Sequence, residues 1–343
     1  MGSNGNLGNT PNSTNGVDAL LEADDLSTGR VGHLGAYAGF VLSQAAVVVS
    51  SDAKTAYMAA SGWSDAGLTP QPTGPGALIA VNLRTMRTES PIGLPVYRPA
   101  AIALSPNGHT AYVANAGRVN QPGSVSAVDL GSRRVLWSTS VSPGLNAIAI
   151  SADGKTAYVT NGAYPEANLA GELAEVDLET RQVARIFSVP TNPAGLAVSG
   201  HSSDVYVASY GPSTLQPPDA TLSIVDLSSN SVRALVNHIR QIPDPTSLVV
   251  GSSDGIVYLL ATDGVVAITN PPETTPGTFV PVADPVSMQL SPDGHAIWVL
   301  SSVKPDGLVV GSGLLTPIDL NGFNLGRPLR TGLEPVAFAL ATK

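Results

Sequence analysis

The stretch AIAISADGKTAYVTN, residues 147–161, decides the fold of this chain. Four apolar residues lead through a short polar segment that contains Asp153-Gly154, and a second apolar run follows. Because Asp-Gly and Asn-Gly pairs tolerate the positive φ angles of tight turns, this pattern predicts a β-hairpin. Nearly the same text, AIALSPNGHTAYVAN, stands at residues 101–115, so the hairpin is one copy of a repeat.

The repeat runs through most of the chain and has a recurring aromatic residue. This position is occupied six times, at intervals of 40 to 55 residues, by Tyr57, Tyr112, Tyr158, Tyr206, Tyr258 and Trp298. A second anchor follows each aromatic, at residues 80–83 (AVNL), 127–130 (AVDL), 175–178 (EVDL), 224–227 (IVDL), 267–270 (AITN) and 317–320 (PIDL). Each unit is therefore predicted to hold four strands, like the blade of a β-propeller.

The number of units predicts an all-β fold: a seven-bladed β-propeller of four-stranded antiparallel blades, forming one domain over residues 17–343. Six units are complete, and ADDLSTGR at 23–30 resembles EVDLETRQ at 175–182. The seventh blade is expected to combine strands near 17–22 and 28–36 with an innermost strand at 335–341, while its second strand has no assigned segment. A blade shared between the two termini would close the ring and remove exposed sheet edges.

One segment admits two interpretations. SVRALVNHIRQI, residues 231–242, places Val232, Leu235, Val236 and Ile239 on one face of a helix. The repeat instead assigns an outer strand there, and we favour the strand because tertiary context overrides local pattern.

Composition limits the possible partners and chemistry. Of the 343 residues, 43% are hydrophobic and 13% charged, with a formal net charge of −9 and no cysteine. An acidic chain without a Lys/Arg cluster disfavours nucleic acid, and the lack of cysteine excludes disulfides and thiolate chemistry. No apolar run reaches the roughly eighteen residues of a membrane span. Residues 1–16, rich in Gly, Asn, Ser and Thr, are expected to be a flexible leader that replaces a removed export signal.

The residues Tyr158-Val159-Thr160-Asn161, with SADGK before them and EVDLETRQV after them, resemble the YVTN-type β-propeller repeat family. YVAN at 112–115 is a near copy, and the resemblance covers residues 17–343. It implies a propeller that is exported or attached to a bacterial or archaeal surface, with lactonases and lyases among the neighbouring families. Because the matching residues are those expected in hairpin turns and in the core, the resemblance indicates a fold but does not distinguish between the possible functions.

Motifs typical of catalysis are absent from the sequence. There is no zinc-type histidine pattern, no Gly-x-Ser-x-Gly elbow and no phosphate-binding glycine loop. His109 and His295 follow Asn-Gly and Asp-Gly in turns of different blades, so we interpret them as exposed turn residues. An aspartate recurs at the end of the third strand and is interpreted as a cap of the following turn, at Asp129, Asp177, Asp226 and Asp319.

The loops between second and third strands are long in five units, at residues 61–75, 116–123, 162–170, 210–220 and 303–313. In a propeller these loops and the blade-entry loops emerge on one face, around the mouth of the channel. We expect this face to bind a ligand through Trp63, Asp65, Arg98, Arg118, Asn120, Tyr164, Glu166, Asn168 and Tyr210. The alternative is that the loops only cover the tops of the blades.

The blade-entry loops form a second candidate site. They place five polar residues at equivalent positions: Arg98, Asn192, Asp244, Asp284 and Glu334. Carboxylate and amide oxygens suit a hard divalent cation such as Ca²⁺. The candidate metal ligands are therefore Asn192, Asp244, Asp284 and Glu334. The alternative is that each side chain accepts hydrogen bonds from the backbone of its own loop.

Three functions compete on this evidence. The leading hypothesis is a secreted or cell-surface binding protein, monomeric, which holds an unknown protein, glycan or small ligand on the long-loop face. The alternative is a metal-dependent, lactonase-like hydrolase or lyase that uses the four candidate metal ligands at the channel mouth. The third is a purely structural or surface-layer module.

Overall fold

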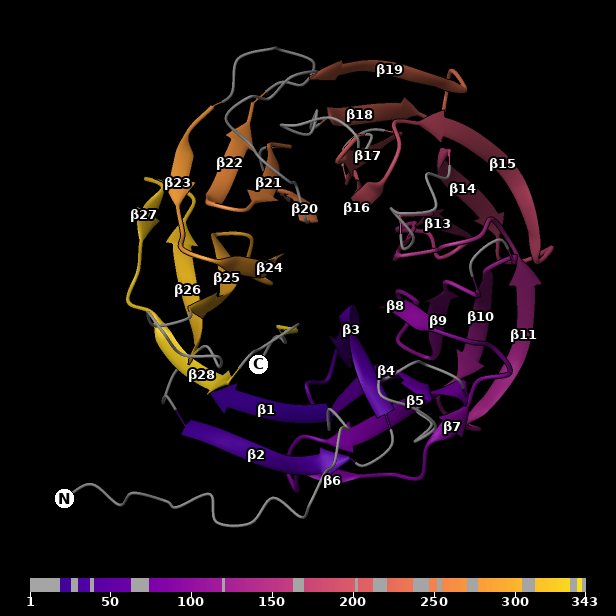
Figure 1. Ribbon diagram of the computed structural model, residues 1–343, viewed down its shortest axis with the longest axis horizontal. Helices are drawn as coiled ribbons and strands as arrows, with labels where there is room; N and C mark the ends of the chain where they lie inside the picture. The colour runs from indigo at the N-terminus through magenta and orange to yellow at the C-terminus, as the bar shows by residue number, and fades with distance from the viewer. Residues whose placement is uncertain are drawn as a thin grey trace, which may run out of the picture.

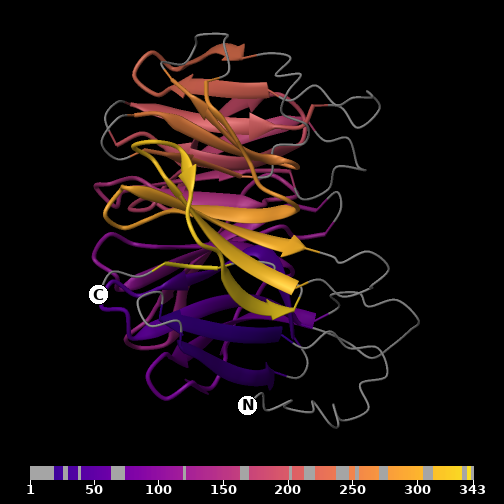
Figure 2. The same cartoon turned by 90° about the vertical axis from the view of Figure 1, so that its left-hand side faces the viewer.

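The computed structural model is all-β, with its blades arranged in a ring (Figure 1). It describes residues 19–25, 30–37, 40–62, 74–118, 121–162, 170–200, 203–211, 221–236, 247–251, 255–269, 277–303, 312–333 and 338–340. Figure 2 shows the ring from the side, with the strands of the blades running between its two faces. In the described residues, no helix is long and apolar enough to cross a membrane.

Six blades follow one another along the chain, each an antiparallel sheet whose first strand lies innermost. Blade 1 contains β3 (Phe40–Val49), β4 (Thr55–Gly62), β5 (Gly74–Asn82) and the short β6 (Arg87–Thr88) and β7 (Ile92–Gly93). Blade 2 contains β8 (Pro99–Leu104), β9 (Thr110–Asn115), β10 (Ser124–Asp129) and β11 (Arg134–Ser140). Blade 3 contains β12 (Ala147–Ile150), β13 (Thr156–Thr160), β14 (Gly171–Asp177) and β15 (Gln182–Val189).

The second half of the ring repeats this order. Blade 4 contains β16 (Pro193–Val198), β17 (Asp204–Ser209), β18 (Thr221–Asp226) and β19 (Ser231–Val236). Blade 5 contains β20 (Ser247–Val250), β21 (Val257–Ala261), β22 (Gly264–Ile268) and β23 (Phe279–Pro281). Blade 6 contains β24 (Pro285–Leu290), β25 (Ala296–Val303), β26 (Ser312–Asp319), β27 (Asn324–Leu325) and β28 (Leu329–Leu333). The strand assignment for residues 231–236 is thus confirmed, and residues 237–242 lie outside the described part.

The prediction of seven blades is wrong, because the structure has six. The N-terminal strands exist, as β1 (Ala19–Asp25) and β2 (Arg30–Tyr37), but they pair only with each other in a two-stranded sheet. Residues 338–340, the described part of the expected innermost strand, are not a strand. Figure 1 shows the β1–β2 hairpin between blade 6 and blade 1. The seventh position therefore holds a two-stranded hairpin and not a four-stranded blade. The six blades correspond to the six complete repeat units.

The C-terminal segment is nevertheless attached to the last blade through one side chain. Gln289 on β24 donates its Nε2 hydrogen to the carbonyl of Phe338 at 2.7 Å. Its Oε1 accepts a hydrogen bond from the backbone nitrogen of Leu340 at 3.0 Å. The glutamine amide therefore takes the place of a neighbouring strand by satisfying both backbone groups.

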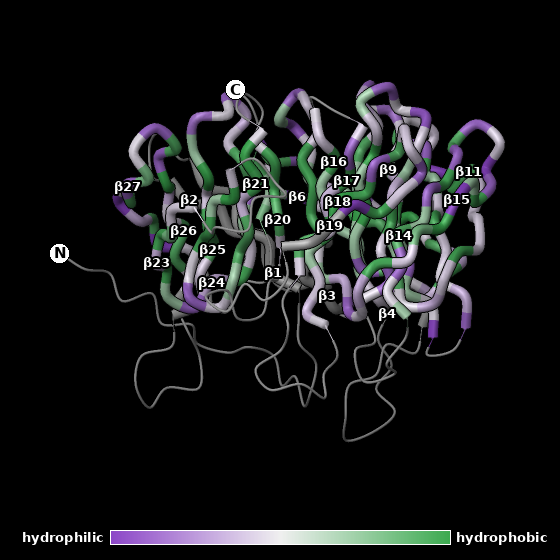
Figure 3. The backbone as a smooth tube through the Cα atoms, turned by 90° about the horizontal axis from the view of Figure 1, so that it is seen from above, coloured by the Kyte–Doolittle hydropathy of each residue, from purple (hydrophilic) through white to green (hydrophobic). Residues whose placement is uncertain are grey.

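The core lies between neighbouring blades, where the recurring tyrosines of the second strands in blades 1 to 5 pack. Tyr158 on β13 is 5% exposed and packs in a cluster with Leu173 of its own blade and Val207 of blade 4. Similar clusters join the other neighbouring blades, for example Tyr258 with Met288 between blades 5 and 6. Figure 3 shows the mainly hydrophobic strands and the mainly hydrophilic turns at one face. The inner strands of blades 1 and 2 also touch through one parallel pairing.

The predicted hairpin turns are confirmed, with a hydrogen-bond network that the sequence alone did not reveal. Ser151 Oγ donates to Asp153 Oδ1 at 2.6 Å, and the same oxygen accepts from Lys155 N at 3.0 Å. Ser151 Oγ in turn accepts from the backbone of Thr156 at 3.0 Å, while Gly154 adopts a φ of 72°. The same bonds recur around Ser50/Asp52, Ser105/Asn107 and Ser291/Asp293.

The predicted aspartate caps are confirmed as well. In blade 3, Asp177 Oδ1 accepts from the backbone nitrogens of Glu179 and Thr180 at 2.9 and 2.7 Å. Asp129, Asp226 and Asp319 make equivalent bonds at the ends of their strands. Because these carboxylates satisfy turn backbone, they serve the fold.

Candidate functional site

The candidate site is the face of the ring where the blade-entry turns meet the loops that follow the second strands. Arg98, Asn192 and Asp284 occupy the same position in blades 2, 4 and 6, each directly before a proline that begins the inner strand. All three adopt left-handed backbone angles, with φ values of 53°, 55° and 44°. Such angles are uncommon outside glycine, so their recurrence marks a built turn.

The backbone of each entry turn is tied to the start of a long loop. The carbonyls of Arg98, Asn192 and Asp284 accept hydrogen bonds at 2.8, 3.0 and 3.0 Å. The donors are the backbone nitrogens of the residues that follow or end the second strands, Ala116, Tyr210 and Ser302. The entry turns therefore hold the loop bases in place, on the face where the sequence predicts them.

The side chains at this position differ in what they do. Asn192 is buried, and its Nδ2 donates to the carbonyl of Gly211 at 2.9 Å. The alternative to metal binding was a hydrogen bond from each side chain to the backbone of its own loop. Asn192 makes a bond of this kind, with its amide as the donor and not as the acceptor that we expected. Asp284 is exposed at its turn. The other candidate ligands, Asp244 and Glu334, lie outside the described residues.

The described residues do not assemble a metal centre. Within the described ranges, no group of three or more His, Asp or Glu side chains is arranged to hold an ion. Two of the four predicted ligands are in that part of the chain, and the Asn192 amide nitrogen is bonded to its own loop. A Ca²⁺ site at the mouth thus stays a prediction.

A second asparagine joins neighbouring blades on this face. Asn146, at the entry of blade 3, accepts from Thr160 Oγ1 at 2.9 Å and from Gly162 N at 2.8 Å through its Oδ1. Its Nδ2 donates to the carbonyl of Pro193 in blade 4 at 2.8 Å. One amide therefore fixes the position of the next entry turn, a role that the sequence analysis missed.

Blade 2 carries the clearest binding feature in the described part of this face. The guanidinium carbon of Arg118 lies 4.6 Å from the centre of the Tyr97 ring, so the two side chains form a cation–π pair. Both residues are exposed, and Arg98 beside them is half-buried. Sequence analysis selected Arg98 and Arg118 but missed Tyr97. The sequence did contain a clue to Tyr97. The residue directly before Arg98 is aromatic, whereas Thr191 and Ala283 stand at the same place in blades 4 and 6.

The described residues on both sides of Arg118 make close backbone contacts. Gly117 has a φ of 72°, and a Cβ atom added there would lie 2.6 Å from the carbonyl oxygen of Pro122. The backbone nitrogen of Gln121 donates to the Arg118 carbonyl at 2.9 Å, and that of Gly117 to the Tyr97 carbonyl at 3.3 Å. Such contacts hold the arginine and the aromatic ring together in advance of any ligand.

The remaining predicted ligand contacts are only partly described. Tyr210 is half-buried and begins the blade 4 loop, where its backbone nitrogen bonds Asn192. Six predicted residues lie outside the described part: Trp63, Asp65, Asn120, Tyr164, Glu166 and Asn168. The structure thus places Arg98 and Arg118 on two segments of blade 2 that are joined by backbone hydrogen bonds, and Tyr210 in blade 4.

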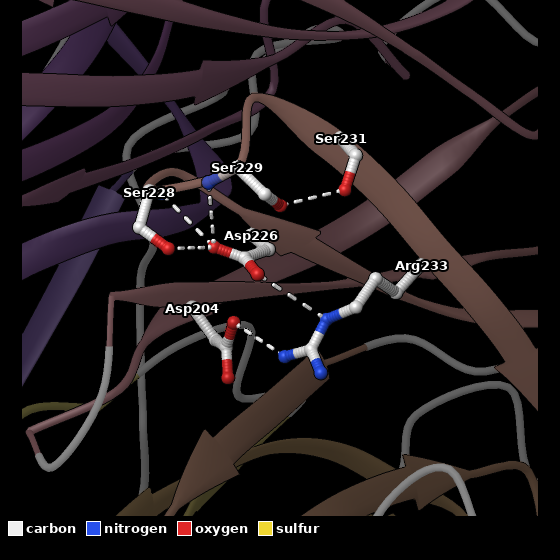
Figure 4. Close-up of polar contacts among 6 residues, drawn as sticks. All are labelled: Asp204, Asp226, Ser228, Ser229, Ser231 and Arg233. Carbon is white, nitrogen blue, oxygen red and sulfur yellow. Dashed lines mark hydrogen bonds and ion pairs between the residues drawn. The ribbon is translucent and has the colours of Figure 1, made fainter.

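The opposite face carries a charged network in blade 4 (Figure 4). Arg233 Nη2 lies 2.9 Å from Asp204 Oδ1, and its Nε lies 3.5 Å from Asp226 Oδ2. The Ser228 hydroxyl, 2.6 Å from Asp226 Oδ1, and the backbone of Ser229 hold the pKa of Asp226 far below its usual range. Asp204 raises the pKa of Arg233. These contacts fasten β19 to its blade, and the lowered pKa of Asp226 and the raised pKa of Arg233 are both shifts away from neutral pH, unlike those of an acid–base pair.

Comparisons with known proteins support the fold and leave the function open. No protein-family model and no curated protein sequence matches the chain. Among solved structures, 1175 chains match, and one of them is a chain of hydrazine synthase from Kuenenia stuttgartiensis. It has a TM-score of 0.65 and 18% sequence identity, and the match covers 90% of this chain and 93% of that one. At this identity the likeness shows a shared β-propeller fold alone, and membership of the YVTN-type family stays a prediction.

Proposed function

We propose that this chain is a non-catalytic binding propeller, exported or surface-associated, whose ligand is held on the face of the entry turns and long loops. The observation that carries the proposal is the exposed Arg118–Tyr97 pair, whose two backbone segments are joined by hydrogen bonds. A rigid scaffold that presents an aromatic ring and cations on loops is typical of a recognition surface.

The chemistry of the described carboxylates favours binding over catalysis. Among the described residues, every aspartate with a clearly shifted pKa is shifted downwards, and each one caps a turn: Asp52, Asp129, Asp153, Asp177, Asp226 and Asp293. A general acid at neutral pH would need the opposite shift. These residues also belong to the turns of the other face, away from the loops.

A metal-dependent, lactonase-like hydrolase or lyase is the second candidate. The observation in its favour is Asp284, an exposed carboxylate on an entry turn, with Asp244 and Glu334 at the same sequence position of their units. Metal analysis of the purified protein, with melting curves in EDTA and in Ca²⁺, tests it. A stoichiometric ion and a rise in Tm with Ca²⁺ would favour this candidate, and the absence of both would count against it.

The binding proposal is tested by screening the immobilised protein against glycans and secreted proteins. Ligands that bind should bind more weakly to the Tyr97→Ala and Arg118→Ala variants. They should bind normally to Arg134→Ala, which removes an exposed arginine from the outer strand β11. Hits that are turned over, or that ignore every substitution on the loop face, would contradict the proposal. Fractionation of the source cells tests the predicted secreted or surface location.

A further inference from the structure

We propose that Tyr97 and Arg118 form a subsite for an oxyanion, a carboxylate or phosphate group carried by a small ligand. This inference rests on the proposed binding function and names the chemistry of one part of its ligand. The two residues come from two segments of blade 2, the entry turn and the loop after β9, which are joined by two backbone hydrogen bonds.

The stacked geometry of Arg118 leaves its donors available. A guanidinium that lies over an aromatic ring uses its flat face, while its N–H groups point outward in the plane and can bind an oxyanion in bidentate fashion. Arg133, Arg185 and Arg233 each bond a carboxylate of this chain. Arg118 makes no hydrogen bond or ion pair through its side chain to another described residue; its contact is the Tyr97 ring.

The backbone around Arg118 is preorganised by two glycines. The constraint at Gly117 is the close approach of the Pro122 carbonyl, and a Cβ atom added to Gly123 would lie 2.5 Å from the carbonyl oxygen of Asn115. Backbone positions constrained in this way lose little conformational freedom on binding, which lowers the cost of ordering them. The backbone that carries Arg118 is thus held next to the Tyr97 segment before a ligand arrives.

The local charge differs from that of the whole molecule. The chain has a formal net charge of −9, and the equivalent entry positions in blades 4 and 6 are Asn192 and Asp284. Blade 2 instead has Arg98 at that position, and the entry turn is hydrogen-bonded through its backbone to Ala116 and Gly117, directly before Arg118. Arginine in place of asparagine and aspartate makes the local potential at this turn more positive than at the other two, which favours an anion there.

The test uses titration calorimetry of the full chain with three probes: glucuronate, glucose 6-phosphate and glucose. At least one of the two anions should bind, and glucose should not. Arg118→Gln should weaken that binding at least tenfold, since it removes charge-assisted hydrogen bonds. Arg134→Gln is the matched control, because it makes the same change in net charge on β11 and should leave the affinity unchanged. Binding of glucuronate or of glucose 6-phosphate alone identifies the group as carboxylate or phosphate.

A second variant separates charge from loop shape. Gly117→Ala keeps Arg118 but forces the loop to move, so it should weaken anion binding without a change of charge. Failure of either anion to bind the wild type, or equal affinity for wild type and Arg118→Gln, would overturn the subsite. If the glycan and protein screen still gives ligands that depend on other loop residues, the binding function stands and only this inference fails.

Discussion

At the scale of single residues, the hairpin turns contain one misfit. Four turns place a glycine at the left-handed position, with φ between 65° and 72°, whereas blade 1 has Ala53 at a φ of 55°. Because a Cβ atom is strained in this region, Ala53→Gly should raise the free energy of unfolding by about 0.5–1 kcal/mol. Urea denaturation of both proteins measures the difference.

The reverse substitution serves as the control for this prediction. A Cβ atom added at Gly108 would meet nothing closer than Ser51 Oγ at 3.6 Å, so Gly108→Ala isolates the effect of the backbone angle. It should destabilise the protein by about 1 kcal/mol. A loss of stability from Ala53→Gly would show that chain entropy outweighs strain at this turn.

The same turns predict a loss of stability in acid. The Ser50 hydroxyl and the backbone of Lys54 lower the pKa of Asp52 from 3.8 to about 2. A carboxylate whose pKa is lower in the folded state stabilises that state above the unfolded pKa, and the contribution disappears as the pH falls through the folded value. Tm should therefore fall as the pH is lowered from about 4 to about 2. Ser50→Ala should make this decrease in Tm smaller, because it removes the hydrogen bond that lowers the pKa of Asp52 most. The same dependence of Tm on pH in the variant and the wild type would contradict the role given to Ser50.

At the scale of elements, the junction between blades 3 and 4 depends on one amide. Asn146→Ala leaves the Gly162 nitrogen and the Pro193 carbonyl without the partners seen in the structure. The loss of partners for partly buried backbone groups should destabilise the protein by about 1–3 kcal/mol. Denaturant titration measures this change in the free energy of unfolding. Asn146→Asp keeps the acceptor oxygen and loses the N–H donors, so its stability should lie between those of the wild type and Asn146→Ala. A variant as stable as the wild type would show that water replaces the bridge.

At the scale of the whole molecule, we predict that the stability of the ring depends on the two hydrogen bonds between Gln289 of the last blade and the C-terminal segment. Gln289→Ala removes both hydrogen bonds to residues 338–340 and should cost about 1–3 kcal/mol, seen as a lower Tm in one cooperative transition. Gln182→Ala on the exposed face of β15 is the control and should not change Tm. An unchanged Tm in Gln289→Ala would mean that the segment adds nothing to closure.

Most of the fold followed from local pattern, because hairpin turns and alternating strands depend on neighbouring residues. The blade number did not, since the similarity of residues 23–30 to the second anchor and the turn that follows it can reveal a hairpin but not whether two more strands join it. In the site, the shared position of Arg98, Asn192 and Asp284 was predictable from the proline after each. The bond from the Asn192 amide to Gly211 was not, because it depends on how a distant loop folds back.

The entry turns of blades 2 and 6 carry opposite charges at equivalent positions, so the face that contains them is not the same all the way around the ring. Arg98 and Asp284 begin blades 2 and 6, whose inner strands β8 and β24 lie on opposite sides of the ring in Figure 1. A ring of identical blades would accept a ligand in any rotation about its axis. On the proposed binding function, this ring would distinguish the two ends of a ligand that carries opposite charges and would place the anionic end over blade 2. Such a ligand would be recognised by its orientation as well as by its composition.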